Sequence, residues 1–197
     1  MEILEAADEL IGEVGYDAVS ARDIAERAGV NKALVFYYWG SKSELFDRIL
    51  ERYYAAHREA LKDAFATRGS RKERARMVVD AYLDFIESHL NYPRLVQQQL
   101  AGGGTHRDAI ERHLTPFFEW TVELLKEIAP QKGPLAARHF YLSISGIVTN
   151  YFTYAPAITE GWNGDPMSER ALKERREHVH WVVDTLLTSL SDEGPRV

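Results

Sequence analysis

The chain has 197 residues, of which 45% are hydrophobic, and it contains no cysteine. It can therefore bury a substantial core, while disulfide bonds and thiolate metal sites are excluded. No stretch approaches the roughly 20 apolar residues that a membrane-spanning helix requires. The acidic, amphipathic start is unlike a signal or transit peptide, so we expect a cytoplasmic protein that does not enter a membrane.

The net charge of −6 is concentrated near the N-terminus. Residues 1–66 hold eight Lys or Arg against thirteen Asp or Glu, but residues 20–42 hold four cations and two anions. Many of the acids lie in the first predicted helix. An acidic domain binds polyanions weakly, because cations must neutralise phosphates. Any nucleic-acid contact is therefore expected in the locally basic segment 20–42.

Apolar residues recur every three or four positions along nearly the whole chain, and no segment alternates as a strand would. A first helix carries Ile3, Ala7, Leu10 and Val14 on one side and ends at Gly15. The pattern predicts an all-α fold of about nine helices.

Residues 20–45 predict two short helices around one glycine, followed by the start of a third helix. Ser20 is placed to cap the first of them, with Asp23 three residues later as in a capping box. Gly29 ends that helix, where glycine adopts the left-handed conformation without steric cost. The small Ala25 permits a close crossing of the two helices. These features predict a helix-turn-helix, whose second helix is suited to the major groove of DNA.

The next helix begins at Ser41, with Glu44 at the capping offset, and continues well beyond the helix-turn-helix. Residues 66–70 form the first clear break. Further helices are predicted at about 71–90, 93–101, 108–128, 135–155 and 168–190, with a kink near Pro116 and a break at residues 102–104.

The first third of the chain resembles the TetR/AcrR family of bacterial transcriptional repressors. The matching positions are Gly15, Tyr16, residues 19–25, residues 28–32, the aromatic run 36–39, Ser41, Lys42 and Leu45. The resemblance implies a three-helix DNA-binding head and a larger helical regulatory body. We therefore place a helix-turn-helix DNA-binding domain at residues 1–46, with its motif at about 20–39, and a ligand-binding and dimerisation domain at 47–197.

The resemblance implies that eight residues contact double-stranded DNA. Arg22 would reach a phosphate or a guanine edge, Leu34 a thymine methyl group, and the tyrosine hydroxyls and Lys42 would bind phosphates. Phe36 replaces the tyrosine that is usual in the family. Alternatively, Arg22 is an ordinary solvated cation, one tyrosine packs beneath the helix, or Leu34 is a packing residue; Trp39 is expected in the core. The predicted contacts are Ser20, Arg22, Lys32, Ala33, Leu34, Tyr37, Tyr38 and Lys42.

A single helix-turn-helix reads too few base pairs for selectivity, so we expect a homodimer that reads a palindrome. The last two helices carry wide apolar surfaces, which a four-helix bundle across a two-fold axis would bury. The alternative is that these side chains only close the core of their own subunit. The predicted interface residues are Ile144, Val148, Tyr151, Val179, Val182, Val183, Leu186 and Leu190.

The middle of the predicted body is rich in aromatic residues. By resemblance it houses a small-molecule pocket, and its composition favours a hydrophobic or aromatic effector with few polar anchors. The predicted pocket residues are Tyr82, Phe85, His89, Gln98, Phe117, Trp120, Tyr141 and Asn150.

Enzymatic motifs are incomplete. The glycines at 102–104 lack a neighbouring lysine and strand, and the segment 143–146 lacks the leading glycine of a nucleophile elbow. We therefore expect no enzyme, no cofactor, no metal and no catalytic residues. The sequence predicts a dimeric repressor released from its operator by an effector, with marked salt sensitivity. A helical interaction protein with weak or lost DNA binding is the alternative, favoured by the acidic head and Phe36.

Overall fold

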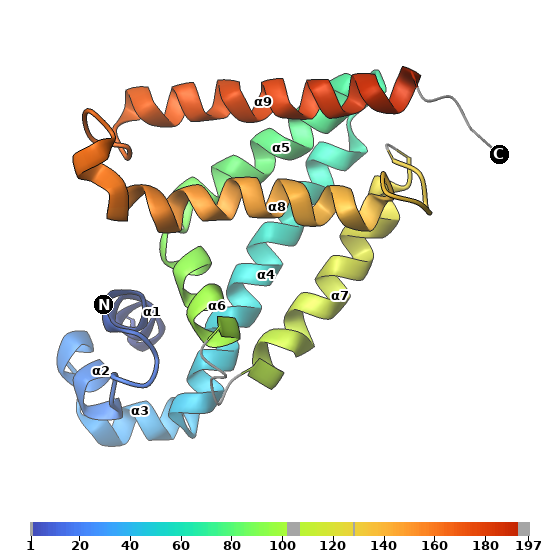
Figure 1. The fold of residues 1–197 in the computed structure, drawn as a ribbon. Coiled ribbons are helices and arrows are strands. Elements are labelled where there is room, and N and C mark those ends of the chain that lie inside the picture. Colours follow the sequence, from blue (N-terminus) through green and yellow to red (C-terminus); the bar gives the residue numbers. More distant parts are fainter. Residues whose placement is uncertain (1, 102–106, 128, 193–197) are drawn as a thin grey trace. The chain divides into compact units, whose positions relative to one another are not determined.

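The computed structural model describes residues 2–101, 107–127 and 129–192, and in this part of the chain every regular element is a helix (Figure 1). The all-α prediction is confirmed. Within these ranges no helix combines the length and apolar character needed to cross a bilayer. The helices are α1 (Ile3–Val14), α2 (Ala21–Ala28), α3 (Lys32–Trp39), α4 (Lys42–Ala66), α5 (Arg71–Ser88), α6 (Asn91–Ala101), α7 (Arg107–Leu125), α8 (Ala137–Tyr154), the 3-10 helix η1 (Ala155–Gly161) and α9 (Glu169–Asp192).

The predicted helix ends near the N-terminus are confirmed. Gly15 follows α1 with φ of 86°, and Gly29 follows α2 in the left-handed conformation. Ser41 accepts a hydrogen bond from the Glu44 amide at the start of α4. Pro116 lies inside α7. The predicted break at residues 102–104 lies outside the described residues.

Two compact units divide the chain, and each is discontinuous in sequence. The N-terminal unit comprises Met1–Ala56 and His89–Pro116, and the C-terminal unit comprises His57–Ser88 and Phe117–Val197. The helices α4 and α7 each contribute to both units. No single cut after residue 46 separates them, because α6 packs on α1 within the N-terminal unit.

A glycine brings α1 and α6 together. A Cβ at Gly12 would lie only 2.4 Å from Cγ of Asn91, so a larger residue there would require the Asn91 side chain to move. The guanidinium of Arg94 donates to the Gly12 carbonyl oxygen at 3.3 Å. Since α1 also packs on α2, α6 is tied to the helix-turn-helix through α1.

A polar cluster joins α1 to α4 inside the same unit. The Tyr53 hydroxyl lies 2.6 and 2.7 Å from the two carboxylate oxygens of Asp8, and the Arg52 guanidinium donates to Asp8 at 2.6 Å. Burial raises the pKa of Asp8 despite these favourable partners. The His89 ring packs edge-to-face against Tyr53, with ring centroids 5.5 Å apart.

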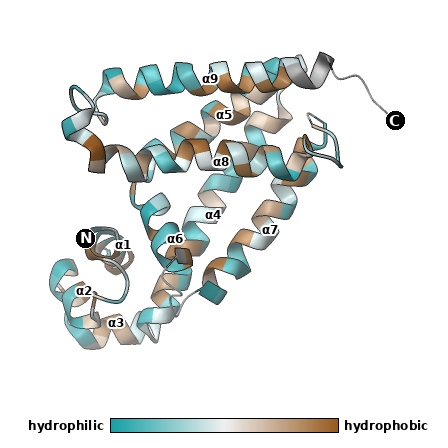
Figure 2. Ribbon diagram, in the orientation of Figure 1, coloured by the Kyte–Doolittle hydropathy of each residue, from teal (hydrophilic) through white to brown (hydrophobic). Residues whose placement is uncertain are grey.

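In the C-terminal unit, α9 lies alongside α5 and α8 (Figure 1). Hydrophilic residues dominate the first half of α9, and apolar residues become frequent in its second half (Figure 2). The first half of α9 forms ion pairs with α5. Arg176 lies 2.9 Å from Asp80 and 2.6 Å from Asp84, and His180 Nε2 lies 2.8 Å from Asp80.

At the other end of the same pair of helices, Lys72 and Arg76 of α5 bond Asp184 of α9. Early α5 residues therefore meet late α9 residues, which makes the two helices antiparallel and fixes their register.

Asp184 gives a pH-dependent contribution to stability. The hydrogen bond from Arg76 lowers the pKa of Asp184 below its ordinary value of 3.8. The unfolded chain therefore takes up the proton first as the pH falls, so this contribution is present above pH 3.8 and is lost as the pH falls through the lowered value. We expect Asp184→Asn to reduce the free energy of unfolding at pH 7, with the difference shrinking below pH 3.8.

Urea denaturation across this pH range measures the effect. Glu177→Gln, on an exposed acid of the same helix with no recorded ion pair, serves as the control and should change little. An Asp184→Asn deficit that stays constant into acid would contradict the ion-pair assignment.

Candidate DNA-binding surface and effector cavity

Local hydrogen bonds cap the starts of α2 and α3. The Ser20 hydroxyl accepts from the Asp23 amide at 3.2 Å, and the Ser20 amide donates to Asp23 Oδ2 at 2.8 Å. Asn31 Oδ1 accepts from the Ala33 amide at 2.6 Å and so caps α3. These bonds satisfy amides that a helix start leaves without intrahelical partners. The predicted capping role of Ser20 is confirmed.

The helix α3 exposes most of its side chains. Val35 is its one buried residue and Trp39 is half-buried, so six of eight residues face solvent. The alternative in which a tyrosine packs beneath the helix is wrong. The exposed fractions are 80% for Tyr37, 64% for Tyr38, 43% for Phe36 and 38% for Leu34, and Lys32 and Ala33 are also exposed.

Aromatic contacts organise this exposed surface. The rings of Tyr37 and Tyr38 meet edge-to-face with centroids 5.2 Å apart, and the Lys32 ammonium lies 5.6 Å from the Phe36 ring centroid. Both hydroxyl groups remain on the surface, where they can donate to a phosphate.

Two of the four cations in residues 20–42 are engaged within the protein. Arg27 bonds Glu13 at 2.9 Å and Glu9 at 3.3 Å. The Lys42 ammonium donates to the carbonyl oxygens of Tyr16 and Val19, at 2.8 and 2.7 Å, and lies 4.0 Å from the Tyr16 ring centroid. Burial lowers the pKa of Lys42.

Arg22 and Lys32 are the two cations of residues 20–42 for which no hydrogen bond or ion pair is recorded. They are both exposed and available to a polyanion. The predicted phosphate contact of Lys42 stays a prediction. Because two of its three N–H groups already bind backbone carbonyls, its observed role is to tie the start of α4 to the turn between α1 and α2.

Because Lys42 is bonded within the protein and Arg22 is exposed, substitutions of these two cations should have different effects. Lys42→Met removes the ammonium donor from the Tyr16 and Val19 carbonyl oxygens, of which only Tyr16 keeps a second donor, the Val19 amide, so the free energy of unfolding should fall by about 1–3 kcal/mol. Arg22→Met should leave stability unchanged and weaken DNA binding. Urea denaturation and a mobility-shift titration of both variants make the comparison, and a fully stable Lys42→Met protein would show that the ammonium is not a structural tie.

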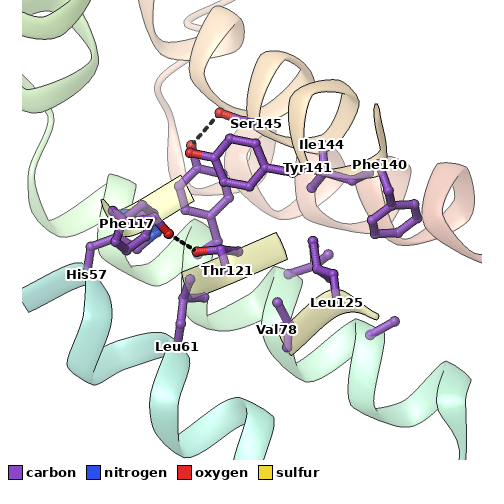
Figure 3. A pocket seen from close by; sticks show the side chains of 13 residues that line it. His57, Leu61, Val78, Phe117, Thr121, Leu125, Phe140, Tyr141, Ile144 and Ser145 are labelled. Atoms are coloured by element: carbon purple, nitrogen blue, oxygen red, sulfur yellow. Dashed lines mark hydrogen bonds between the residues drawn. The ribbon is translucent and has the colours of Figure 1, made fainter. Parts of the chain in front are cut away.

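A second feature, a cavity of about 50 Å³, lies in the C-terminal unit (Figure 3). It is enclosed by residues of α4, α5, α7 and α8, none of which is Asp, Glu, Lys or Arg. The lining residues are His57, Leu61, Ala75, Val78, Val79, Tyr82, Phe117, Thr121, Leu125, Phe140, Tyr141, Ile144 and Ser145.

Few polar atoms face this cavity. The Tyr82 hydroxyl and Ser145 Oγ lie 3.3 Å apart, and the Thr121 hydroxyl donates to the Phe117 carbonyl oxygen at 2.9 Å. The His57 ring stacks on Tyr82, with centroids 4.8 Å apart and planes 7° from parallel. The cavity therefore suits an apolar, uncharged group.

The structure sorts the eight predicted pocket residues into three groups. Tyr82, Phe117 and Tyr141 line the cavity. Two others contact residues of the lining. The Phe85 ring stacks on the His57 ring with centroids 4.2 Å apart, and the centroids of the Trp120 and Phe117 rings lie 5.9 Å apart.

The remaining three predicted pocket residues do not line this cavity. His89 and Gln98 belong to the N-terminal unit, and Asn150 is exposed on α8. Sequence reasoning missed His57, since a lone histidine in a helix carries no local signal of a cavity.

Most of the residues predicted to form the dimer interface are buried in the C-terminal unit. Five of them are buried inside their own unit, so they cannot meet a second subunit. Val182 and Leu186 are half-buried, and the Leu190 side chain lies outside the described residues. The five buried residues are Ile144, Val148, Tyr151, Val179 and Val183. The large apolar side chains that stay exposed on these helices are Leu142 and Tyr154 of α8 and Trp181 of α9.

Residues 3–49 match the model of the family described as bacterial regulatory proteins, tetR family. The HTH-type transcriptional activator FasR of Mycolicibacterium smegmatis is 34% identical over 95 residues, which cover 48% of this chain and 43% of the relative. The chain thus matches less than half the length of that relative.

Solved structures extend the likeness over the whole fold. The fatty acid degradation regulator FadR from Bacillus halodurans superposes with a TM-score of 0.71 at 20% identity, covering 98% of this chain and 94% of that one. AibR, in complex with isovaleryl coenzyme A and operator DNA, gives a TM-score of 0.71 at 16% identity and covers 91% and 95%.

The helix-turn-helix of residues 3–49 thus matches the TetR family of bacterial regulatory proteins, and the chain as a whole shares the fold of these two solved regulators.

Proposed function

We propose that this chain is a DNA-binding transcriptional regulator whose helix α3 enters the major groove. The observation that carries the proposal is the exposure of six of the eight α3 residues next to a correctly capped turn. Arg22, Lys32 and the hydroxyls of Tyr37 and Tyr38 supply donors for DNA. The N-terminal residues of a recognition helix are those that approach base edges.

The proposed regulator acts as a homodimer on a palindromic operator. Its contact surface would use the outward faces of α8 and α9, since their other apolar faces fill the core. Trp181 is 64% exposed on α9, and Leu142 and Tyr154 are exposed on α8. Exposed large apolar side chains of this kind are enriched where proteins associate.

The number of available cations limits the electrostatic part of DNA binding. Each phosphate neutralised on B-DNA contributes about −0.9 to the slope of log affinity against log salt. Arg22 and Lys32 supply about four contacts in a dimer. With Arg27 and Lys42 engaged internally, we expect weaker salt dependence than the sequence alone indicated.

The salt slope is therefore a specific prediction. A selected operator duplex, titrated by fluorescence anisotropy between 50 and 200 mM salt, should give a slope of about −4, and Arg22→Met should reduce its magnitude by about two per dimer. A slope near −7 would mean that the paired cations also reach phosphates. No binding of random or selected DNA at low salt would favour the interaction protein without DNA binding.

We further propose that a small hydrophobic effector in the C-terminal cavity controls DNA binding. The cavity, at about 50 Å³, is smaller than the roughly 150 Å³ apolar cavity that admits benzene in another protein. A ligand must therefore displace side chains of the surrounding helices. Two of these helices, α4 and α7, continue into the N-terminal unit, so displacement has a covalent route to the DNA-binding surface.

The effector must bind the form with low DNA affinity more tightly, because equal affinity for both forms shifts no equilibrium. FadR is described as a fatty acid degradation regulator, and AibR binds isovaleryl coenzyme A. Both favour an acyl chain as the group that enters the apolar cavity. We propose repression as the regulatory sign, with effector binding releasing the operator; FasR, an activator, shows that the family also contains the opposite sign.

Filling the cavity tests the effector site. Ala75 is 2% exposed and lines the cavity, so Ala75→Leu would occupy the space. A thermal-shift screen of fatty acids, straight-chain alcohols and acyl-coenzyme A identifies a ligand of the wild type. Ala75→Leu should keep operator binding and lose the ligand response, while Ala55→Leu, at an exposed site of α4, should keep both. A full response from Ala75→Leu would place the effector elsewhere.

A further inference from the structure

The exposed surface of α3 has an unusual chemistry for base recognition, and we infer from it which bases are read. We propose that Leu34 is a specificity-determining residue that contacts the 5-methyl group of a thymine in each operator half-site. This inference rests on the proposed function, since it concerns the same helix and the same groove.

The orientation of α3 follows from its single anchor. Successive residues of an α-helix are rotated by about 100°, so Ala33 and Tyr37 point almost opposite to the buried Val35. Leu34 and Phe36 stand about 100° to either side of Val35 and flank that outward face. Their exposures of 38% and 43% agree with these positions. Ala33, Leu34, Phe36 and Tyr37 therefore form the side of α3 opposite Val35, and the exposed Lys32 and Tyr38 lie on its two flanks.

This face has very few groups that can read a base edge by hydrogen bonding. The Tyr37 hydroxyl is its single polar side-chain atom. Bidentate recognition of guanine or adenine needs Arg, Lys, Asn or Gln. Of the two such residues at the start of α3, Asn31 caps the helix with its side-chain carbonyl oxygen at 2.6 Å, which holds this side chain against the start of α3. Lys32 lies beside Phe36, on one flank.

The major groove offers one kind of apolar group to such a surface. Guanine, cytosine and adenine present acceptors and donors there, whereas thymine adds a 5-methyl group. An apolar side chain pressed against polar edges would desolvate them without replacing their hydrogen bonds, which costs free energy. Contact with a methyl group instead removes apolar surface from water on both partners.

Leu34 is the member of this face best placed for the contact. It lies in the first turn of α3, where residues of a recognition helix approach the bases. Ala33 carries only one methyl group. Tyr37 and Phe36 lie a turn further along, and Phe36 faces the Lys32 ammonium. Leu34 therefore combines reach, exposure and an apolar side chain.

The test first selects operators from random duplexes with the full-length wild-type protein. Each thymine of the selected half-site is then replaced by deoxyuridine, which pairs identically and lacks only the 5-methyl group. Burial of one methyl-sized group corresponds to about fourfold in affinity. We expect one thymine position at which this replacement weakens binding about fourfold, and about fifteenfold when both half-sites carry it.

A mutant cycle assigns the contact to Leu34. With Leu34→Ala, affinity for the thymine operator should fall and deoxyuridine at that position should no longer matter. Met77→Ala, on an apolar residue of α5 with 41% exposure, should retain the wild-type sensitivity. Circular dichroism checks that Leu34→Ala keeps its helical content.

The outcomes are distinguishable. If wild type selects a DNA sequence but binds its deoxyuridine form equally well at every position, methyl readout is overturned while the proposed function stands. The same holds if Leu34→Ala remains as sensitive to deoxyuridine as wild type. Failure to select any sequence overturns both the regulator function and this inference.

Discussion

The helix α3 has eight residues and buries only one side chain, so it is too short to be stable by itself. Isolated helices of this length are marginal in water, so α3 depends on the contacts at its two ends. Asn31 caps its start, and the left-handed Gly29 sets its angle to α2. After its end, the Lys42 ammonium fastens α4 to the turn between α1 and α2. Since these contacts use backbone atoms, the outward side chains of α3 are left to meet DNA.

The parts of the fold predicted from sequence were those fixed by local interactions. The capping box at Ser20 and the turn at Gly29 each involve residues at most five apart, which a sequence displays directly. The role of Lys42 was missed because its acceptors lie 23 and 26 residues earlier in the chain. Periodicity failed for α8 and α9, because an apolar residue does not indicate whether its own unit or a second subunit covers it. Val148 is fully buried, whereas Leu142 on the same helix is 60% exposed.

The division into interleaved units changes how regulation is understood. A boundary after residue 46 would join two domains by a single connection, but both α4 and α7 contribute residues to the cavity-bearing unit and to the DNA-binding one. His57 lines the cavity on the same helix that Lys42 begins. A widening of the cavity therefore acts on the helix whose first residue is bonded to the turn between α1 and α2, and this is the physical basis of the proposed ligand response.

The most direct test of the central claim places a DNA-cleaving iron chelate on α3. The chain contains no cysteine, so Tyr37→Cys creates a unique attachment point on an α3 residue that is 80% exposed. If α3 enters the major groove of a palindromic operator, the bound protein should cut the DNA at two clusters about one helical turn, or about 10 base pairs, apart. Bound protein that leaves the operator uncut, while remaining able to retard it in a gel, would contradict the placement of α3 in the groove.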